Sequence, residues 1–221
     1  VNSSLPISIK SIFHGRIKFR NLYTTELGWK ITRRRWDNPK SGFLRPFLIL
    51  AKIKERIKIL SLKNRYRRMC SNHKKLNNYI FFATSMEPES STIPTALNGR
   101  HITIALRRIF DVLPNDYTVV YKEHPTQFTQ QILFTTEWKS KYFYEELKKI
   151  GKIIFVKDYL SAKDLIDGSI GVATINGTIG IEALMQGKRC ITFAPQWYDD
   201  YDGLHYVKSR NDIADAVKLM L

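Results

Sequence analysis

The sequence has few cysteines, no long apolar run and very little negative charge in its first third. Among its 221 residues only Cys70 and Cys190 are cysteines, and neither belongs to a CxxC pair or has a histidine at zinc-ligand spacing. This argues against a structural zinc site and against a disulfide scaffold, and it indicates a reducing compartment. No apolar run reaches the roughly 18 residues of a membrane-spanning helix, and no signal-peptide pattern is present. We therefore expect a cytoplasmic protein, either free or peripheral on the inner face of the plasma membrane.

Negative charge is scarce in residues 1–76, where 20 Lys+Arg are opposed only by Glu26, Asp37 and Glu55, so that this segment carries +17. The remaining residues hold 16 Lys+Arg and 17 Asp+Glu, a net charge of −1. The basic character thus belongs to an extension, and the rest forms the globular part. The chain begins with Val and ends inside an apolar pattern, so we expect a piece of a longer protein.

A helical pattern runs through this extension from residue 47 to about residue 75, with isoleucines and leucines interleaved with lysines and arginines. A basic amphipathic helix of this kind can lie on an anionic membrane surface, with the lysine and arginine stems directed toward the head groups. It can equally be a linker helix packed on another domain, and the residues leave both interpretations open. Nucleic acid is an unlikely partner, because no nucleic-acid-binding motif accompanies the positive charge. We assign no regular structure to residues 1–46.

Beyond residue 77, short apolar runs alternate with helical patterns. The runs predict strands at 79–84, 117–121, 152–156, 170–173 and 190–193. The patterns between them predict helices at 100–113, 136–150, 161–166 and 179–186, and a last one from residue 211. In the helix at 179–186 we expect Ile181, Leu184 and Met185 on the apolar side. This alternation predicts an α/β fold, a Rossmann-like parallel sheet with helices on both faces that spans 77–221.

Polar residues gather where three of these strands end, in loops at 86–92, 122–125 and 174–178. Ligands bind at the carboxyl edge of a parallel sheet, so these loops should form one site. The side chains that they and the following helix offer are Glu89, Lys122, His124, Asn176, Gly177, Thr178 and Glu182. A lysine, a histidine and free N–H groups at a helix start suit phosphate.

Each signal also has a simpler interpretation when it is taken alone. His124 can be an ordinary loop histidine, although Pro125 restricts its backbone to an extended conformation and so aims the imidazole. The glycine turn at 176–178 can be an ordinary strand-to-helix corner with a surface Glu182. We interpret Asp199-Asp200 as a solvated acidic tip, and we expect no metal and no cofactor.

Three separated motifs resemble one family. They are Lys122-Glu-His-Pro125, the stretch Thr174-Ile-Asn-Gly-Thr-Ile-Gly-Ile-Glu-Ala-Leu-Met-Gln-Gly-Lys188, and the earlier acidic loop Pro88-Glu-Ser-Ser-Thr92. Over about residues 77–221 the chain is similar to the C-terminal half of the capsular polysaccharide biosynthesis glycosyltransferases, which include Kdo transferases and have the GT-B fold.

The resemblance implies a role for each residue of the site. The catalytic histidine would be His124, which would bind the donor phosphate with the assistance of Lys122. Asn176, Gly177 and Thr178 would line the phosphate pocket, and Glu182 would hold the ribose. Glu89 would belong to the acidic loop.

The implied reaction is transfer of a sugar from a nucleotide-sugar donor, CMP- or CDP-linked, to a growing surface or capsular polysaccharide. The acceptor would be a glycan or lipid-linked glycan. Residues 1–76 are too short to form the second Rossmann domain of such an enzyme, so we name no general base and expect the donor-binding half of a glycosyltransferase. Two alternatives stay open: a CDP-glycerol-type polyol-phosphate transferase, and a non-catalytic remnant that docks on a membrane.

Overall fold

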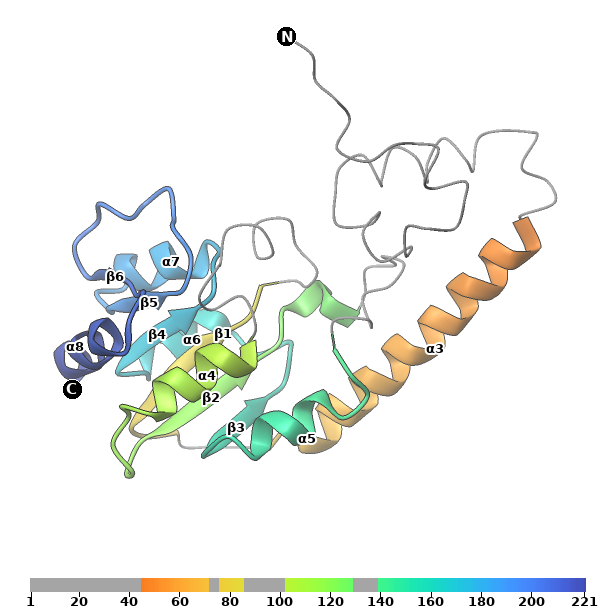
Figure 1. Ribbon diagram of the computed structural model, residues 1–221, viewed down its shortest axis with the longest axis horizontal. Helices are drawn as coiled ribbons and strands as arrows, with labels where there is room; N and C mark the ends of the chain where they lie inside the picture. Colours follow the sequence, from red (N-terminus) through yellow and green to blue (C-terminus); the bar gives the residue numbers. More distant parts are fainter. Residues whose placement is uncertain (1–44, 72–75, 86–101, 129–138) are drawn as a thin grey trace, which may run out of the picture.

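A long helix and an α/β domain make up the described part of the chain, which is residues 45–71, 76–85, 102–128 and 139–221 of a computed structural model (Figure 1). Glu89 lies outside these residues. The helix is α3 (Arg45–Met69). The domain runs β1 (Tyr79–Ala83), α4 (Ile102–Phe110), β2 (Thr118–Lys122), the 3-10 turn η3 (Pro125–Phe128), α5 (Phe143–Lys148), β3 (Ile153–Val156), α6 (Ala162–Asp167), β4 (Gly171–Thr174), α7 (Ile179–Met185), β5 (Cys190–Thr192), β6 (Leu204–Tyr206) and α8 (Arg210–Met220).

The strands form one parallel sheet in the order β3-β2-β1-β4-β5-β6. Because β1 lies at the centre, Phe82 has Tyr121 of β2 on one side and Ala173 of β4 on the other. The direction of winding reverses between β1 and β4, and this reversal opens a crevice at the carboxyl ends of the strands. The predicted Rossmann-like α/β fold is confirmed. The sixth strand, Leu204–Tyr206, was not predicted, because it is only three half-buried residues long.

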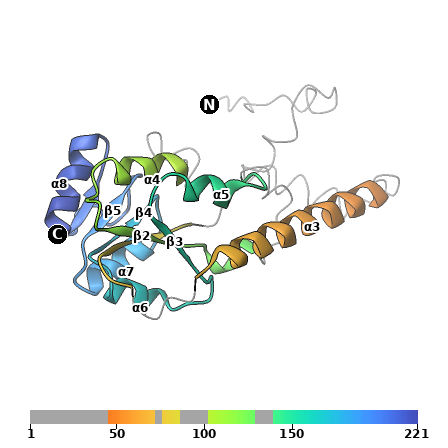
Figure 2. The ribbon, with the colours of Figure 1, turned by 90° about the horizontal axis from the view of Figure 1, so that it is seen from below.

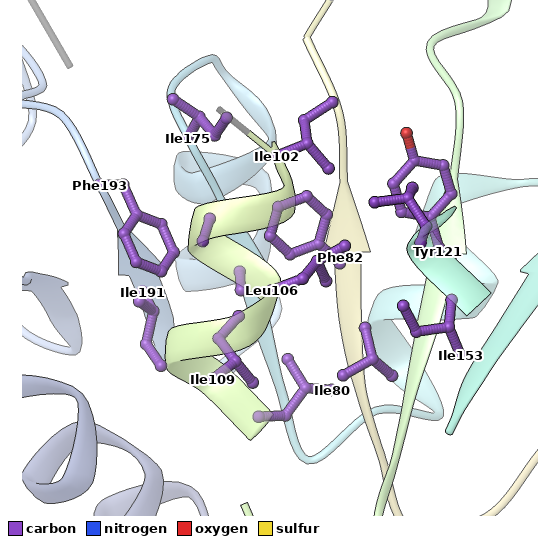
Figure 3. Packing of buried hydrophobic residues seen from close by; sticks show 14 of the residues in the cluster. Ile80, Phe82, Ile102, Leu106, Ile109, Tyr121, Ile153, Ile175, Ile191 and Phe193 are labelled. Atoms are coloured by element: carbon purple, nitrogen blue, oxygen red, sulfur yellow. The ribbon is translucent and has the colours of Figure 1, made fainter. Parts of the chain in front are cut away.

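Helices cover both faces of the sheet (Figure 2): α4, α5 and α8 lie on one face, and α6 and α7 lie on the other. Under α4, the side chains of Leu106 and Ile109 pack against Ile80 and Phe82 of β1 (Figure 3). A smaller cluster under α6 and α7 includes Phe81. Strands that are buried on both faces read as unbroken apolar runs, which is why β1 could be located from the sequence.

The C-terminal half of α3 belongs to the core of the domain. Ile59, Leu62 and Tyr66 are buried there. The Tyr66 hydroxyl donates to the carbonyl of Val156 at 2.5 Å and accepts the backbone N–H of Glu123 at 2.9 Å, so it joins the ends of β3 and β2. The N-terminal half of α3 extends beyond the domain (Figures 1 and 2). The boundary at residues 76 and 77 stays a prediction, although the last turns of α3 pack on the domain. None of the described helices is both long and apolar enough to span a bilayer.

The apolar side that we predicted for α7 is wrong at Met185, while Ile181 and Leu184 are half-buried. Its buried residues are Gly180 and Ala183, whereas Met185 is 83% exposed. Small residues face inward because the helix lies close to the loop after β5: a Cβ added to Gly180 would lie 2.5 Å from the Tyr198 hydroxyl oxygen. The helix predicted at 136–150 is also shorter. It begins at Phe143, and its first predicted turn lies partly outside the described residues.

Candidate functional site: a cleft at the carboxyl edge of the sheet

A cleft of about 530 Å³ opens at the carboxyl ends of β1, β2 and β4, where the winding of the sheet reverses. Its lining includes six of the residues expected to form the site, namely Lys122, His124, Asn176, Gly177, Thr178 and Glu182. The seventh, Glu89, lies outside the described residues. Residues more than 50 positions apart in the sequence therefore meet at one rim, as the order of strands and helices predicted.

Lys122 is the last residue of β2, and its side chain is nearly buried, with 8% of the residue exposed. Burial lowers the pKa of its ammonium group, and the carboxylates of Asp158 and Glu182 oppose that shift in part. The ammonium group forms no ion pair or hydrogen bond with any residue that the structure describes. A cation in this state attracts an anion that enters the cleft.

His124 is held by short contacts on two sides. Its backbone N–H donates to Thr84 Oγ1 at 3.1 Å, and its Nδ1 lies 2.7 Å from Thr126 Oγ1. The Thr126 backbone N–H also donates to Nδ1, at 3.3 Å. Because Nδ1 accepts this bond, the neutral imidazole carries its proton on Nε2. The neutral ring of His124 thus has its N–H donor at Nε2, and the contacts with Thr84 and Thr126 restrict its orientation.

Behind this histidine lies an ion pair that the sequence did not reveal. Glu123 and Lys139 both have fully buried side chains, and the Lys139 ammonium lies 2.8 Å from each carboxylate oxygen. The Tyr121 hydroxyl donates to the same carboxylate at 2.5 Å. Glu123 therefore anchors the loop whose neighbouring residues, Lys122 and His124, line the cleft. A glutamate in a polar loop after a strand is normally exposed, so no local pattern marks this one as buried.

The turn after β4 is braced from two sides. Gly177 has φ 118°, a conformation that side chains with a Cβ rarely adopt. The Ser85 hydroxyl lies 2.6 Å from the main-chain oxygen of Asn176 and 2.7 Å from its Oδ1. On the other side, the Tyr198 hydroxyl donates to the carbonyl of Gly177. The turn is thus held in shape by the loops after β1 and β5.

The turn was expected to offer free N–H groups, and for Gly177 this is wrong, because its N–H donates to Gln196 Oε1 at 3.3 Å. The next two N–H groups, of Thr178 and Ile179, have no acceptor within the described ranges. Both residues line the cleft. The Thr178 hydroxyl lies 3.5 Å from Glu182 Oε1, which places that carboxylate beside the turn.

Several residues of the site were not predicted. Thr84 and Ser85 directly follow β1 and hold His124 and Asn176, and a search for polar residues at the strand end could have found them. Gln196 and Tyr198 could not be found in this way, because they act through the folded loop. The prediction of a solvated acidic tip is wrong for Asp199, which is half-buried and whose Oδ2 accepts the backbone N–H of Gln196 at 2.9 Å, whereas Asp200 is exposed.

The lining of the cleft combines apolar residues such as Phe81 and Ala83 with charged and polar groups. Among the residues that the structure describes, no group of three or more His, Cys, Asp and Glu side chains is placed to hold a metal ion. What the cleft offers is the Lys122 ammonium, the His124 imidazole and the N–H groups of Thr178 and Ile179, with the Glu182 carboxylate as an acceptor. Donors that converge in this way can bind the oxygens of a phosphate group.

Comparison with known proteins gives the family. Residues 70–215 match the family described as "Capsule polysaccharide biosynthesis protein". The chain belongs to this family. All six described residues of the predicted site lie within the matched segment, as does the buried pair of Glu123 and Lys139. A search of the curated proteins found no match.

Three solved structures are similar to this capsule family chain at low sequence identity. The UDP-GlcNAc 2-epimerase of Methanocaldococcus jannaschii is 14% identical with a TM-score of 0.48, and the match covers 72% of this chain and 42% of the epimerase. KpsC of Thermosulfurimonas dismutans, described as a beta Kdo 2,7 transferase, is 17% identical with a TM-score of 0.41, covering 79% of this chain and 57% of KpsC. MnaA of S. aureus, solved with UDP, is 15% identical with a TM-score of 0.43, and the match covers 72% of this chain and 42% of MnaA. The chain thus spans about half the length of these proteins.

Proposed function

We propose that this chain is the donor-binding half of a glycosyltransferase and that its cleft binds the phosphate of a nucleotide-activated sugar. One observation carries the proposal: Lys122, His124, Thr178 and Ile179 line a single cleft where the winding of the sheet reverses. The N–H groups of Thr178 and Ile179 have no acceptor among the described residues. Open α/β sheets bind ligands at this place. Membership of a family named for capsule polysaccharide synthesis supports a sugar as the group that the nucleotide carries.

The reaction would use these donors on the leaving group. As an acceptor hydroxyl attacks the anomeric carbon of the sugar, the bond from that carbon to the phosphate oxygen breaks, and negative charge collects on the nucleotide phosphate. The Lys122 ammonium and the His124 Nε2–H would stabilise that charge, which is the most effective place for preformed donors to act. The proton of the acceptor hydroxyl needs a base, and we assign that base to no residue of this chain.

The remaining groups of the cleft suit the nucleoside. Glu182 can accept hydrogen bonds from ribose hydroxyls, and its distance from the Thr178 hydroxyl places it within the same pocket. A volume of about 530 Å³ accommodates a nucleotide. We propose a cytidine nucleotide as the carrier, by the resemblance of the histidine-proline motif, and a glycan or lipid-linked glycan as the acceptor.

Nuclear magnetic resonance of the whole chain tests the binding step. Addition of CMP or CDP should shift the backbone amide signals of His124, Thr178 and Glu182, and inorganic phosphate should shift the first two but not Glu182. Replacing His124 with Ala should weaken CMP binding about tenfold to a hundredfold, because a hydrogen bond to a charged group is lost. Lys218→Met, an exposed lysine of α8, is the matched control and should leave the affinity unchanged.

Two results would count against the proposal. If no nucleotide shifted any amide signal at millimolar concentration, the cleft would not be a donor-binding site. Shifts that appear only around other residues, with His124 and Glu182 silent, would place the nucleotide elsewhere. If uridine nucleotides shifted the same amide signals at lower concentration than cytidine nucleotides, the position of the binding site would stand, and the nucleotide of the donor would be uridine instead of cytidine.

A further inference from the structure

The helix α3 carries two apolar stripes, and the residues that the structure describes cover one of them. Ile59, Leu62 and Tyr66 form the inner stripe, which packs into the core of the α/β domain. Four further aliphatic residues are exposed at helical spacing, namely Leu50 (62%), Ile53 (52%), Ile57 (63%) and Leu60 (43%). At 3.6 residues per turn, these four share one face of the helix, on the side opposite the inner stripe. We call Leu50, Ile53, Ile57 and Leu60 the outer stripe.

Basic residues flank the outer stripe on both sides. The helical positions of Lys54 and Arg68 lie along one border, and those of Arg56 and Lys63 lie along the other. In all, α3 has nine lysines and arginines and a single acidic residue, Glu55, a net charge of +8. Glu55 is 6% exposed and lies on the side of the inner stripe. On α3 itself, the outer stripe and its borders therefore carry positive charge and no carboxylate. A neighbouring carboxylate is Glu145 of α5, which lines a hollow with Ile57 and Leu60 and is paired with Arg65 at 2.9 Å.

This arrangement fits a lipid surface better than a protein partner. The fully buried centre of a protein interface is depleted of charged residues, and every ammonium group placed there must be paired or lose hydration. An anionic bilayer meets both requirements, because the acyl boundary buries the aliphatic stripe while lipid phosphates lie level with the basic borders. Lysine and arginine stems are long enough to reach those phosphates from the sides of the helix.

We propose that α3 lies flat on an anionic membrane surface, with the outer stripe immersed and the basic borders at the head groups. The inner stripe, on the opposite side, then holds the α/β domain on the water side of the helix. This inference is independent of the proposed function, because it uses no residue of the cleft. It assigns the membrane contact to a defined face of α3, where the sequence left a membrane surface and a linker helix as equal interpretations.

Vesicle binding by the full chain tests the surface. Sedimentation with phosphatidylglycerol–phosphatidylcholine vesicles is compared between the wild type and two variants, I53Q/I57Q and K54Q/R56Q. Each lysine or arginine near an anionic surface is worth roughly a fivefold gain in partitioning, so K54Q/R56Q should bind about 30-fold more weakly. I53Q/I57Q should lose at least about tenfold through reduced apolar burial. The matched controls L219Q and K163Q/K218Q change exposed residues outside α3 and should bind like the wild type.

The depth to which position 57 enters the bilayer distinguishes insertion of the outer stripe from electrostatic attraction of α3 to the membrane surface. In a Cys70→Ser background, an environment-sensitive fluorophore is attached at Ile57→Cys or, as control, at Lys218→Cys. Emission from position 57 should shift to the blue with anionic vesicles and be quenched by brominated acyl chains, whereas position 218 should not change. Circular dichroism confirms that each variant is folded, and all substituted positions other than Cys70 are exposed.

Five outcomes would overturn the inference, four from the vesicle and association measurements and one from nucleic-acid binding. The first is binding to vesicles of pure phosphatidylcholine that equals binding to anionic vesicles, and the second is full vesicle binding by both I53Q/I57Q and K54Q/R56Q. The third is unchanged fluorophore emission at position 57. The fourth is self-association of the wild-type chain without vesicles that I53Q/I57Q abolishes. This result would assign the stripe to a second copy of the chain. Tight binding of an oligonucleotide that α3 mediates while vesicles do not bind would assign the basic borders to nucleic acid.

Discussion

The buried pair of Glu123 and Lys139 gives the sharpest prediction about how the site is held in place. Both side chains are fully buried, and the ammonium is 2.8 Å from both carboxylate oxygens. Removing one partner leaves the other charge in the interior, which typically costs about 3–5 kcal/mol. We therefore expect Glu123→Gln and Lys139→Met, which nearly preserve side-chain volume, each to lower the free energy of unfolding by about 3 kcal/mol. The double variant removes both charges and should lose only about 1–2 kcal/mol.

Urea denaturation followed by circular dichroism measures all three variants at neutral pH. The coupling energy of the double-mutant cycle should be several kcal/mol. The pair formed by Arg65 and Glu145 is a matched control: its atoms are 2.9 Å apart, but its side chains are 35% and 38% exposed. Solvent screens such a pair, so its coupling energy should stay below about 1 kcal/mol.

Two results would refute this reasoning about Glu123. One is additive single substitutions, with a coupling energy no larger than that of the control pair. The other is a loss below about 1 kcal/mol for either single variant, which would mean that water reaches the pair. In both cases the loop that carries His124 would have to be fixed by its other bonds, such as those from Glu123 N–H to Tyr66 and from His124 N–H to Thr84.

Three further predictions concern other parts of the chain. Lys122→Met should raise thermal stability, because a buried cation with a lowered pKa is replaced by an apolar chain, while it weakens nucleotide binding in the same preparation. Gly180→Ala should destabilise the domain by about 1–3 kcal/mol in urea, because its Cβ would press on the Tyr198 hydroxyl. Hydrogen bonds from the backbone at Lys208 and from Ser209 lower the pKa of Asp212 from 3.8 to about 2. Its contribution to stability should therefore be complete above about pH 4 and lost as the pH falls to 2, and Asp212→Asn should remove this pH dependence in acid titration.

The sheet could be predicted because its strands are buried on both faces. Runs such as Tyr79–Ala83 contain no exposed position, so their hydrophobicity is continuous and their ends are visible in the sequence. The strand Leu204–Tyr206 has no such signal, because all three residues are only half-buried at the end of the sheet. The inward face of α7 was misjudged for a related reason: close packing against Tyr198 selects glycine and alanine, which a search for large apolar residues passes over.

The cleft could be predicted because the topology of a parallel sheet brings strand ends together. Lys122, His124 and Asn176 needed only the order of strands and helices to be placed at one rim. The supports of the site depend on distant contacts that leave no local pattern. Tyr66 reaches Glu123 across 57 positions, and Tyr198 reaches Gly177 across 21. The sequence thus indicates the groups that face a ligand and is silent on those that hold them.

In the proposed site His124 donates its Nε2–H to a nucleotide phosphate, and the ¹⁵N resonances of the imidazole test this most directly. In the free chain, Nε2 should carry the proton and Nδ1 should not, because Nδ1 accepts the Thr126 backbone N–H. Addition of CMP should shift the Nε2–H signal of His124 while the ring signals of His205, which lies on β6, stay unchanged. A proton found on Nδ1 alone, or a His124 ring that does not respond to saturating nucleotide, would contradict the account.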